Sequence, residues 1–227
     1  MAESPALTIR RDWPRPDPSM LAKFSGFATG NVVDAMGRSG ALDFGIRPII
    51  PAKPFIGAAL PVNTTARDNL GPYAALKVAR PGDVMLISTG DYAFAAVIGD
   101  VMVGMMKNAG IVAVITDGLA RDIPGLTAVG IPVFARGVTP NSPFKHGPAT
   151  VGLPISIGGV IVGPGDVVLG DQDGIVVVPA ARLAEVISEL PAVHRKESDM
   201  EALVAKGSKE PPWLDAALQE KPVHWIE

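Results

Sequence analysis

The stretch that decides the expected fold is Ala109-Gly-Ile-Val-Ala-Val-Ile-Thr-Asp-Gly118. Its central part, residues 111–115, is an unbroken apolar run rich in β-branched side chains, which is typical of a strand buried on both faces. Residues 108–110 supply a helix stop before this strand, and residues 116–118 supply a turn after it. A strand of this kind predicts an α/β fold, in which ligands often bind beyond the carboxyl ends of the strands.

Arg121 and Asp122 follow on the loop beyond the carboxyl end of this strand. A hard cation such as Mg²⁺ or Mn²⁺ needs few protein oxygens, and an Arg beside it offers a planar donor fork for a carboxylate or an enolate oxygen. The pair is therefore a candidate site for a 2-oxo acid. The alternative is a solvated ion pair in a turn, worth ~0–1 kcal/mol, and the chain has a second such pair, Arg67-Asp68.

The sequence on either side predicts short elements separated by Gly and Pro. Apolar residues recur at helical spacing between Phe94 and Met105, so a helix is expected to lead into the buried strand. Two short helices are predicted within residues 20–40, with Asp34 in the second, and another helix at residues 73–79. Further strands are predicted at residues 55–62, 84–88, 131–135, 160–162, 167–169 and 175–178.

Three segments are expected along the chain. Residues 1–20 form a loose, proline-rich N-terminal arm that lacks the apolar core of a signal peptide, and residues 21–190 form the α/β core. Residues 191–227 form a C-terminal helix and tail, expected to lie against a neighbouring subunit, and Pro191 is predicted to end a preceding helix at residues 180–190. No apolar run reaches membrane-spanning length, so no contact with a membrane is expected.

The composition limits the classes of function. With 227 residues, 48% of them hydrophobic, the chain can bury one sizeable core. The formal charge is −3 and Lys and Arg are scattered, so a small molecule is expected as ligand and nucleic acid is not. The absence of cysteine excludes disulfides and thiolate metal sites, and it fits the cytoplasm. The three histidines, His146, His194 and His224, form no metal-binding motif.

Several motifs together resemble one family. They are Asp34-Ala-Met-Gly37, Ala96-Val-Ile-Gly-Asp100, residues 109–118 with Arg121-Asp122, Gly130-Ile-Pro-Val-Phe134, Pro154-Ile-Ser-Ile-Gly-Gly-Val160, Pro164-Gly-Asp166 and Gly170-Asp-Gln-Asp-Gly-Ile-Val-Val-Val-Pro179. The combination, which extends from about Phe24 to Pro179, resembles the RraA-like proteins, which include the 4-hydroxy-4-methyl-2-oxoglutarate aldolases. This resemblance implies a β/β/α swivelling fold of the phosphohistidine-domain type with a C-terminal helical extension. It also implies a homotrimer or a dimer of trimers with sites between subunits.

The resemblance further implies roles for single residues. Asp122 matches the direct ligand of the metal, Mg²⁺ or Mn²⁺, and Arg121 matches the residue that binds the keto or enolate oxygen. Asp100 matches a carboxylate that holds metal-bound water. The alternative for Asp100 is a carboxylate that only stabilises the start of a helix through the helix dipole.

Two more contributions are implied by the same resemblance. The backbone N–H groups of Val101 and Met102, which follow Gly99, would bind the substrate carboxylate, as helix N-termini bind anions. The C-terminal helix of the next subunit would supply one more carboxylate, which Glu197 matches, with Glu201 one turn further on as the substitute. A solvated Glu on a helix surface is an equally open interpretation of Glu197.

The implied activity is that of a divalent-metal-dependent lyase for small 2-oxo acids. It would release pyruvate by retro-aldol cleavage of substrates such as 4-hydroxy-4-methyl-2-oxoglutarate, by decarboxylation of oxaloacetate, or by both. Enzymes of the family usually carry an acidic residue shortly after the Arg-Asp pair, where this chain has Ile123-Pro124-Gly125. Because retro-aldol cleavage needs a base and decarboxylation does not, decarboxylation is expected to survive this difference.

Three other functions stay open at this point. Some relatives regulate ribonuclease E by binding to it, although a regulator without catalysis would be expected to lack the Arg-Asp pair. A methyltransferase would need a glycine-rich loop after an early strand, whereas residues 99–104 fall within the predicted helix. An oligomeric scaffold is the third, and stabilisation by Mg²⁺ would separate the enzyme from it.

Overall fold

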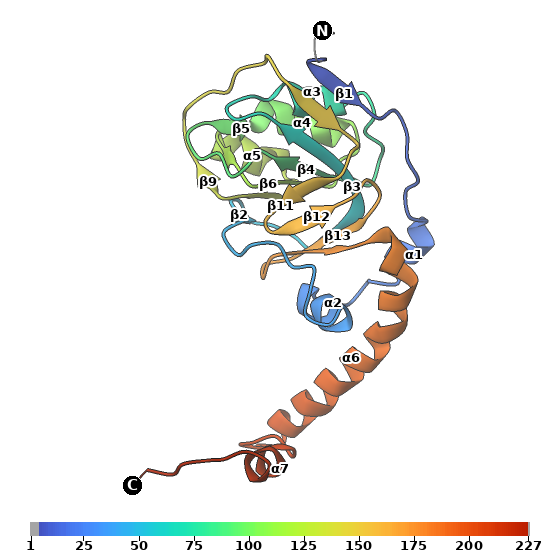
Figure 1. The fold of residues 1–227 in the computed structure, drawn as a ribbon, viewed down its shortest axis with the longest axis vertical. Helices are drawn as coiled ribbons and strands as arrows, with labels where there is room; N and C mark the ends of the chain where they lie inside the picture. The colour runs from blue at the N-terminus through green and yellow to red at the C-terminus, as the bar shows by residue number, and fades with distance from the viewer. Residues whose placement is uncertain (1–4, 227) are drawn as a thin grey trace.

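The structure, a computed structural model, describes residues 5–226 (Figure 1). At its centre lie four parallel strands in the order β3 (Phe55–Thr64), β4 (Asp83–Ser88), β6 (Ala113–Thr116) and β8 (Val133–Ala135). The strand predicted at residues 111–115 is β6, and every residue of β6 is buried. The α/β prediction is confirmed at its central element.

Five further strands complete the main sheet. β10 (Ala149–Val151) pairs antiparallel with the end of β3, β1 (Leu7–Ile9) lies parallel to β10, and β2 (Arg47–Pro48) pairs antiparallel with β8. β13 (Val167–Gly170) pairs with the first half of β3, and β14 (Ile175–Val178) pairs with β13. The long strand β3 therefore joins the parallel centre of the sheet to an antiparallel β13–β14 hairpin.

Two smaller sheets lie beside the main one. β5 (Ala96–Ile98), β7 (Leu119–Ala120) and β9 (Gly137–Val138) are parallel to one another, and β11 (Ile155–Ile157) forms an antiparallel hairpin with β12 (Val160–Val162). Because β7 ends immediately before the Arg-Asp pair, the small parallel sheet fixes where that pair leaves the body of the protein.

Both faces of the main sheet are covered, which explains its unbroken apolar strands. Along β4, Met85 and Ile87 pack in a cluster with side chains from α3 (Leu70–Ala75), α4 (Asp100–Asn108) and α5 (Ile123–Val129). Val84 and Leu86 point to the other face and pack with side chains of β11 to β14. The alternation with a period of two is the expected behaviour of a strand.

A third apolar cluster adds a helical layer beyond the β13–β14 hairpin. There α2 (Thr29–Ala35) and the start of α6 (Leu183–Ala205) pack on the face of the hairpin that points away from the four central parallel strands (Figure 1). The order of layers is thus helices, central parallel strands, β hairpins, helices. This mixed α/β arrangement with a C-terminal helix confirms the predicted fold class.

The prediction of one helix between Phe94 and Met105 is wrong in its first half. Residues 96–98 form strand β5, Gly99 is extended with φ −150° and ψ 178°, and α4 begins only at Asp100. The apolar residues of this segment do recur at helical spacing, but pairing of β5 with β7 overrides that local preference. The other predicted helices appear with shifted ends, as α1 (Pro18–Ala22), α2 and α3.

The prediction that Pro191 ends a helix is also wrong. After a short 3₁₀ turn, η1 (Ala180–Arg182), helix α6 continues through Pro191 to Ala205. Pro191 is exposed, so the carbonyl that its missing N–H leaves free can be hydrated and the helix can continue.

The N-terminal arm is not loose within the described residues. Trp13 is only 3% exposed, and the Arg15 guanidinium lies 3.9 Å above its ring. The same guanidinium forms an ion pair of 2.9 Å, from Nη2 to Oδ2, with the buried Asp83 at the start of β4. Together with the pairing of β1 and β10, these contacts hold residues 7–15 against the core.

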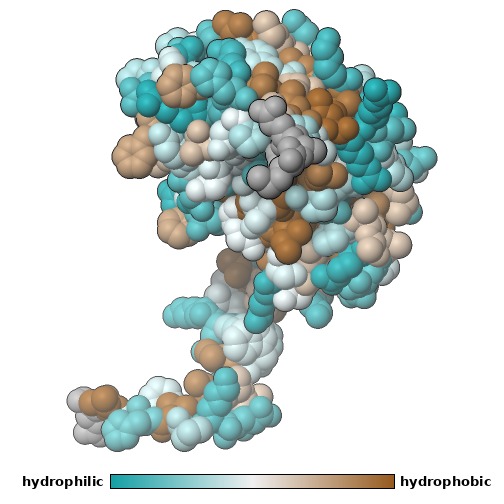
Figure 2. All heavy atoms as spheres, turned by 45° about the horizontal axis from the view of Figure 1, so that its top comes forward, coloured by the Kyte–Doolittle hydropathy of each residue, from teal (hydrophilic) through white to brown (hydrophobic). Residues whose placement is uncertain are grey.

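Helix α6 leaves the body as an arm, visible in Figure 1, that ends in α7 (Leu214–Gln219). Only its first part is buried against the core, and at 1.5 Å per residue its 23 residues span about 35 Å. Large apolar side chains of the arm are exposed and lie among hydrophilic ones in Figure 2. They are Val204, Trp213, Val223, Trp225 and Ile226. Contact of this arm with a neighbouring subunit stays a prediction.

None of the helices within residues 5–226 has the length and apolar character that crossing a membrane requires.

Candidate functional site

The Arg-Asp pair borders a cavity of about 130 Å³. The first turn of α4, the end of β5 and the loop after β7 form part of the wall, and the loop between β9 and β10 completes it. The lining residues are Asn69, Tyr73, Val97, Ile98, Gly99, Asp100, Val101, Met102, Arg121, Asp122, Ser142, Pro143 and Lys145. The structure therefore brings together all the residues predicted for the site except Glu197, although they come from two separate parts of the sequence.

Arg121 and Asp122 are held in a defined arrangement at this cavity. The Nε of Arg121 donates to Oδ2 of Asp122 at 3.1 Å, and its Nη1 donates to Oγ of Ser142 at 2.6 Å. The backbone N–H of Arg121 donates to the carbonyl of Ile98, which ties the pair to β5. Asp122 has a left-handed backbone, with φ 62° and ψ 47°. Such a conformation is uncommon for residues other than Gly, and Asp and Asn adopt it more readily than most.

Gly99 makes the close approach of these elements possible. A Cβ at Gly99 would lie 2.6 Å from Oδ2 of Asp122 and 3.3 Å from Cγ of Arg121. Any residue could adopt the extended backbone of Gly99. Glycine is therefore required here only because a side chain would clash with the Arg-Asp pair. The predicted role of Gly99 in the site thus has a physical basis in the space that it leaves for the Arg-Asp pair.

Asp100 occupies the first position of α4, where its carboxylate is favoured by the helix dipole. Its Oδ1 accepts a 2.7 Å hydrogen bond from the N–H of Val101. The other side of this carboxylate fills the space above Gly125, since a Cβ at Gly125 would lie 2.6 Å from the Asp100 Cγ. Within the Ile123-Pro124-Gly125 stretch that follows the Arg-Asp pair, position 125 thus has no room for a side chain beside Asp100.

The residues of the first turn of α4 line the cavity. The first N–H in the helix that bonds to a backbone carbonyl is that of Val103, which donates to Gly99 at 3.0 Å. The N–H of Met102 is therefore an anion-binding donor of the kind found at helix N-termini. The N–H of Val101 is already engaged by Asp100, so it can bind a substrate carboxylate only if that bond is shared or replaced.

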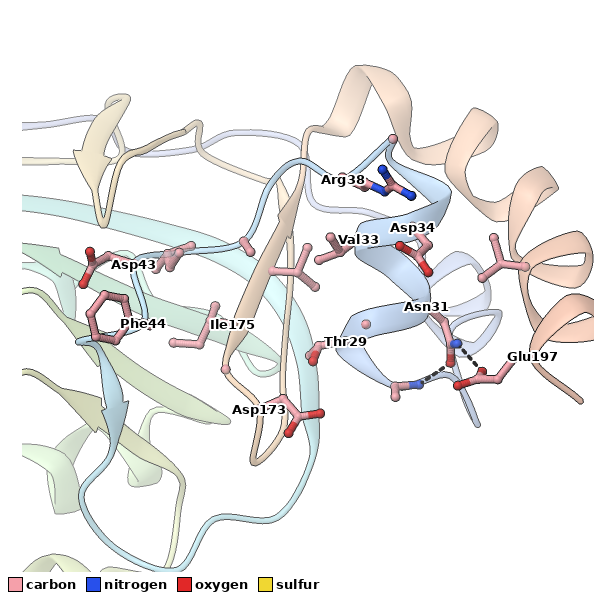
Figure 3. A pocket seen from close by; sticks show the side chains of 18 of the residues that line it. Thr29, Asn31, Val33, Asp34, Arg38, Asp43, Phe44, Asp173, Ile175 and Glu197 are labelled. Carbon is pink, nitrogen blue, oxygen red and sulfur yellow. Dashed lines mark hydrogen bonds between the residues drawn. The ribbon is translucent and has the colours of Figure 1, made fainter. Parts of the chain in front are cut away.

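Glu197 lies elsewhere in the same chain. It borders an open groove between α2, the β13–β14 turn and α6, where the amide nitrogen of Asn31 donates to its Oε2 (Figure 3). One chain does not bring Glu197 to the cavity of Arg121 and Asp122. Its predicted contribution to the site of a neighbouring subunit stays a prediction.

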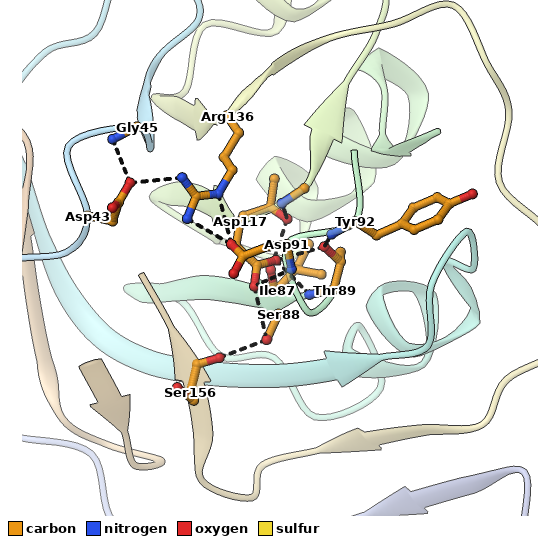
Figure 4. Close-up of polar contacts among 12 residues, drawn as sticks. Asp43, Gly45, Ile87, Ser88, Thr89, Asp91, Tyr92, Asp117, Arg136 and Ser156 are labelled. Carbon is orange, nitrogen blue, oxygen red and sulfur yellow. Dashed lines mark hydrogen bonds and ion pairs between the residues drawn. The ribbon is translucent and has the colours of Figure 1, made fainter. Parts of the chain in front are cut away.

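The sequence did not predict the role of Asp117, which was interpreted only as part of a turn. Asp117 is 2% exposed, and its carboxylate accepts from the N–H and hydroxyl of Thr89 at 2.6 and 2.8 Å and from the hydroxyl of Ser88 at 3.2 Å (Figure 4). A buried carboxylate is tolerated when donors satisfy it. Asp117 thereby joins the ends of β4 and β6 and fixes the start of the chain segment that carries Arg121. The signal available in the sequence was an Asp placed directly after a buried strand.

A second ionic network lies beside Asp117 in Figure 4. Arg136, which follows β8, pairs with Asp43 and with Asp91 at 2.8 Å each. The N–H of Gly45 and the Arg136 guanidinium lower the pKa of the Asp43 carboxyl below its ordinary value. This network holds the loop before β2 against the end of the main sheet and does not reach the cavity.

The oxygen donors of the cavity determine which metal it could hold. Between residues 5 and 226, no three His, Cys, Asp or Glu side chains come together as a metal-binding group. The cavity instead offers the carboxylates of Asp100 and Asp122, and the Asp122 side chain is 41% exposed. Mg²⁺ commonly takes one or two carboxylates and keeps several waters, so the residues fit a hard cation and do not fit a zinc centre with three protein ligands.

Known proteins resemble this chain over most of its length. A family profile described as RraA-like, Aldolase/RraA, matches residues 29–177. A protein of Halalkalibacterium halodurans, provisionally named as a 4-hydroxy-4-methyl-2-oxoglutarate aldolase, is 34% identical over 182 residues, which cover 80% of this chain and 85% of that protein.

Two solved structures have the same fold. An uncharacterized protein from Pseudomonas syringae pv. tomato has a TM-score of 0.75 and 28% identity, and the match covers 87% of this chain and 97% of that chain. Streptomyces coelicolor RraAS2, described as an unusual member of the RNase ES inhibitor RraA protein family, has a TM-score of 0.72 and 24% identity over 83% of this chain and 99% of its own. At that identity the likeness to RraAS2 shows the fold alone.

Proposed function

This chain belongs to the RraA-like family, and from that premise we propose that it is a divalent-metal-dependent lyase that releases pyruvate from small 2-oxo acids. The observation that carries the proposal is the arrangement of Arg121 and Asp122 in one cavity with Asp100 and the first turn of α4. Retro-aldol cleavage and oxaloacetate decarboxylation both develop negative charge on the same keto oxygen, so one arrangement can serve both reactions.

Asp122 is the residue that would hold the cation, and Asp100 would hold water bound to it. Mg²⁺ or Mn²⁺ would supply Lewis-acid polarisation of the 2-keto group. The N–H of Met102 binds the substrate carboxylate, joined by the N–H of Val101 where its bond to Asp100 is shared or replaced, and this fixes the orientation of the keto group. Asp122 would thus bind the cation directly and Asp100 would bind it through water, which matches the small number of acidic residues in the cavity.

Arg121 stabilises the developing enolate oxygen. Its Nε and Nη1 are engaged by Asp122 and Ser142, and within the described part of the chain Nη2 has no hydrogen-bond partner. A guanidinium fixed at two nitrogens loses little side-chain freedom on binding, so Nη2 can donate to an oxygen with a well-defined direction.

Retro-aldol cleavage also requires a base that takes the proton of the C4 hydroxyl. Asp100, or Glu197 of the neighbouring subunit, is the group proposed for this step. Decarboxylation of oxaloacetate needs no base, and we expect it to be the more robust activity, because Ile123-Pro124-Gly125 after the Arg-Asp pair supplies no further carboxylate.

The test is pyruvate release, coupled to lactate dehydrogenase, from oxaloacetate and from 4-hydroxy-4-methyl-2-oxoglutarate. With Mg²⁺ or Mn²⁺ the protein is expected to turn over at least oxaloacetate, faster than the metal alone, and EDTA is expected to abolish the activity. If the protein adds nothing to the rate with free metal, the lyase proposal fails and a binding protein that regulates ribonuclease E becomes the better hypothesis.

Gly99→Ala is expected to lower kcat/KM by about a hundredfold, because the new methyl group displaces the Asp122 carboxylate and a shift of about 1 Å at a reacting centre has an effect of this size. The melting temperature should change by only a few degrees, since alanine accepts the extended backbone. Gly104→Ala on the same helix is the control. A Cβ there has only Val129 nearby, at 3.8 Å, so activity should be unchanged while helix propensity raises stability. Equal activity of both variants would contradict the proposed geometry.

A further inference from the structure

Asn31 lies in the first turn of α2 and connects this helix to α6, far along the chain. The residue is only 8% exposed. Its Oδ1 accepts a 3.0 Å hydrogen bond from the N–H of Ala28, and its Nδ2 donates to Oε2 of Glu197 (Figure 3). Because one end of the amide faces a donor and the other faces an acceptor, turning the amide over would break both bonds. The nitrogen of Asn31 therefore points to Glu197.

The start of α2 is a fixed support for this contact. The N–H and the hydroxyl of Thr29 donate to the two carboxylate oxygens of Asp171, at 2.8 Å each, and Asp171 directly follows β13. On the same helix Val32 is fully buried in the apolar cluster of the β13–β14 hairpin. Asn31 is thus anchored to the main sheet independently of α6.

Glu197 is the last residue of α6 that a hydrogen bond ties to the body of the protein. The last buried residue of this helix, Leu190, comes two turns earlier, and the His194 ring packs edge-on against Phe27 with 5.6 Å between ring centres. Within residues 5–226, no hydrogen bond joins residues 198–226 to the body. Asn31 therefore determines where the carboxylate of Glu197 is held.

This contact leaves the charge of Glu197 available. Its Oε1 has no hydrogen-bond partner in the described part of the chain, and neither Arg38 nor Lys196, which line the same groove, lies within ion-pair distance of it. A neutral amide holds a carboxylate without cancelling its charge, as Arg or Lys would. A carboxylate with one oxygen fixed and the other free can accept a proton from a defined direction.

We infer that Asn31 is a positioning residue, which holds Glu197 so that its free oxygen takes the C4 hydroxyl proton of a substrate bound at the Arg-Asp pair of a neighbouring subunit. This inference rests on the proposed function, which assigns that step to Asp100 or to Glu197. As the proton passes to Glu197, the O–H electrons form the carbonyl at C4, the C3–C4 bond breaks, and its electrons form the enolate of pyruvate. Asn31 contacts none of the reacting atoms and acts only through Glu197.

The experiment measures kcat and KM for both substrates with Mg²⁺ in the variant Asn31→Asp. Aspartate keeps the shape of the side chain and the oxygen that accepts from Ala28, but it loses the donor to Glu197. For retro-aldol cleavage kcat should fall by about a hundredfold with little change in KM, because repulsion between the two carboxylates displaces the base. Decarboxylation of oxaloacetate, which needs no base, should change by less than about threefold. The melting temperature should not fall, since an Asp in the first turn suits the helix dipole.

Two comparisons show whether the effect passes through Glu197. Glu197→Gln should also lower kcat for cleavage by about a hundredfold, and adding Asn31→Asp to it should cause no further loss, because the effects of residues that act as one unit are not additive. Asn108→Asp, the same chemical change at the exposed last residue of α4, is the control and should leave both reactions unchanged.

The outcomes separate this inference from the proposed function. A wild-type rate of cleavage in Asn31→Asp, a further loss in the double variant, or an equal loss of decarboxylation overturns the role of Asn31 and leaves the lyase in place. A wild-type protein that decarboxylates oxaloacetate but does not cleave 4-hydroxy-4-methyl-2-oxoglutarate does the same. If the wild type releases pyruvate from neither substrate, the proposed function fails, and the role of Asn31 fails with it.

Discussion

Asp122→Asn is expected to lower kcat/KM for pyruvate release by about a thousandfold, because losing the ligand of the cation removes several kcal/mol of transition-state stabilisation, and each 1.4 kcal/mol is about tenfold. Asparagine has the same shape and tolerates the left-handed backbone that Asp122 adopts, with φ 62°, so the fold should persist. The wild-type protein should gain in melting temperature with Mg²⁺, and the variant should not.

The matched control is Asp215→Asn, the same chemical change at an exposed position in the first turn of α7. It should leave both the rate and the response to Mg²⁺ unchanged. Metal-dependent turnover by Asp122→Asn within tenfold of the wild type would show that Asp122 is not the ligand. In that case Asp100 would be the first residue to examine.

Arg121→Lys is expected to lower kcat by about a hundredfold, with a smaller change in KM. Lysine keeps the positive charge but lacks the planar fork that lets Arg121 contact Asp122 and Ser142 while a third nitrogen stays free. The loss corresponds to one donor removed from a developing oxyanion. Steady-state kinetics with oxaloacetate at saturating Mg²⁺ separates the two parameters.

Arg182→Lys serves as the control, because Arg182 pairs with Glu185 on an exposed helix start away from the cavity. Its kinetics should match those of the wild type. If Arg121→Lys raises KM and keeps kcat, Arg121 binds the ground state and the transition state equally and gives no selective stabilisation of the transition state.

The central strand could be predicted because burial on both faces leaves a strong local signal in residues 111–115. The start of α4 could not, because Gly99 is extended and β5 pairs with β7, a contact between segments that are distant in sequence. The continuation of α6 through Pro191 could not be predicted either, because it depends on the exposure of one face of the helix. Local patterns predicted elements correctly where no tertiary contact competed with them.

The candidate site was predicted through motifs, and the structure adds the contacts between them. Arg121, Asp122 and Asp100 meet in one cavity as expected. Asp117 was not predicted as part of this arrangement, because its role comes from Thr89, which lies far from it in the sequence. The role predicted for Glu197 stays a prediction, because it involves a second chain.

The pairing of β1 with β10 has a consequence for the order of events during synthesis. Leu7 leaves the ribosome long before its partner Ala149, which lies 142 residues further along the chain. Trp13 faces a similar delay, because it packs against Gly152. Closing so long a loop is slow. The segment of β1 and Trp13 is therefore expected to dock late during folding on the ribosome. Until it docks, the edge of the sheet that it will cover is accessible to chaperones.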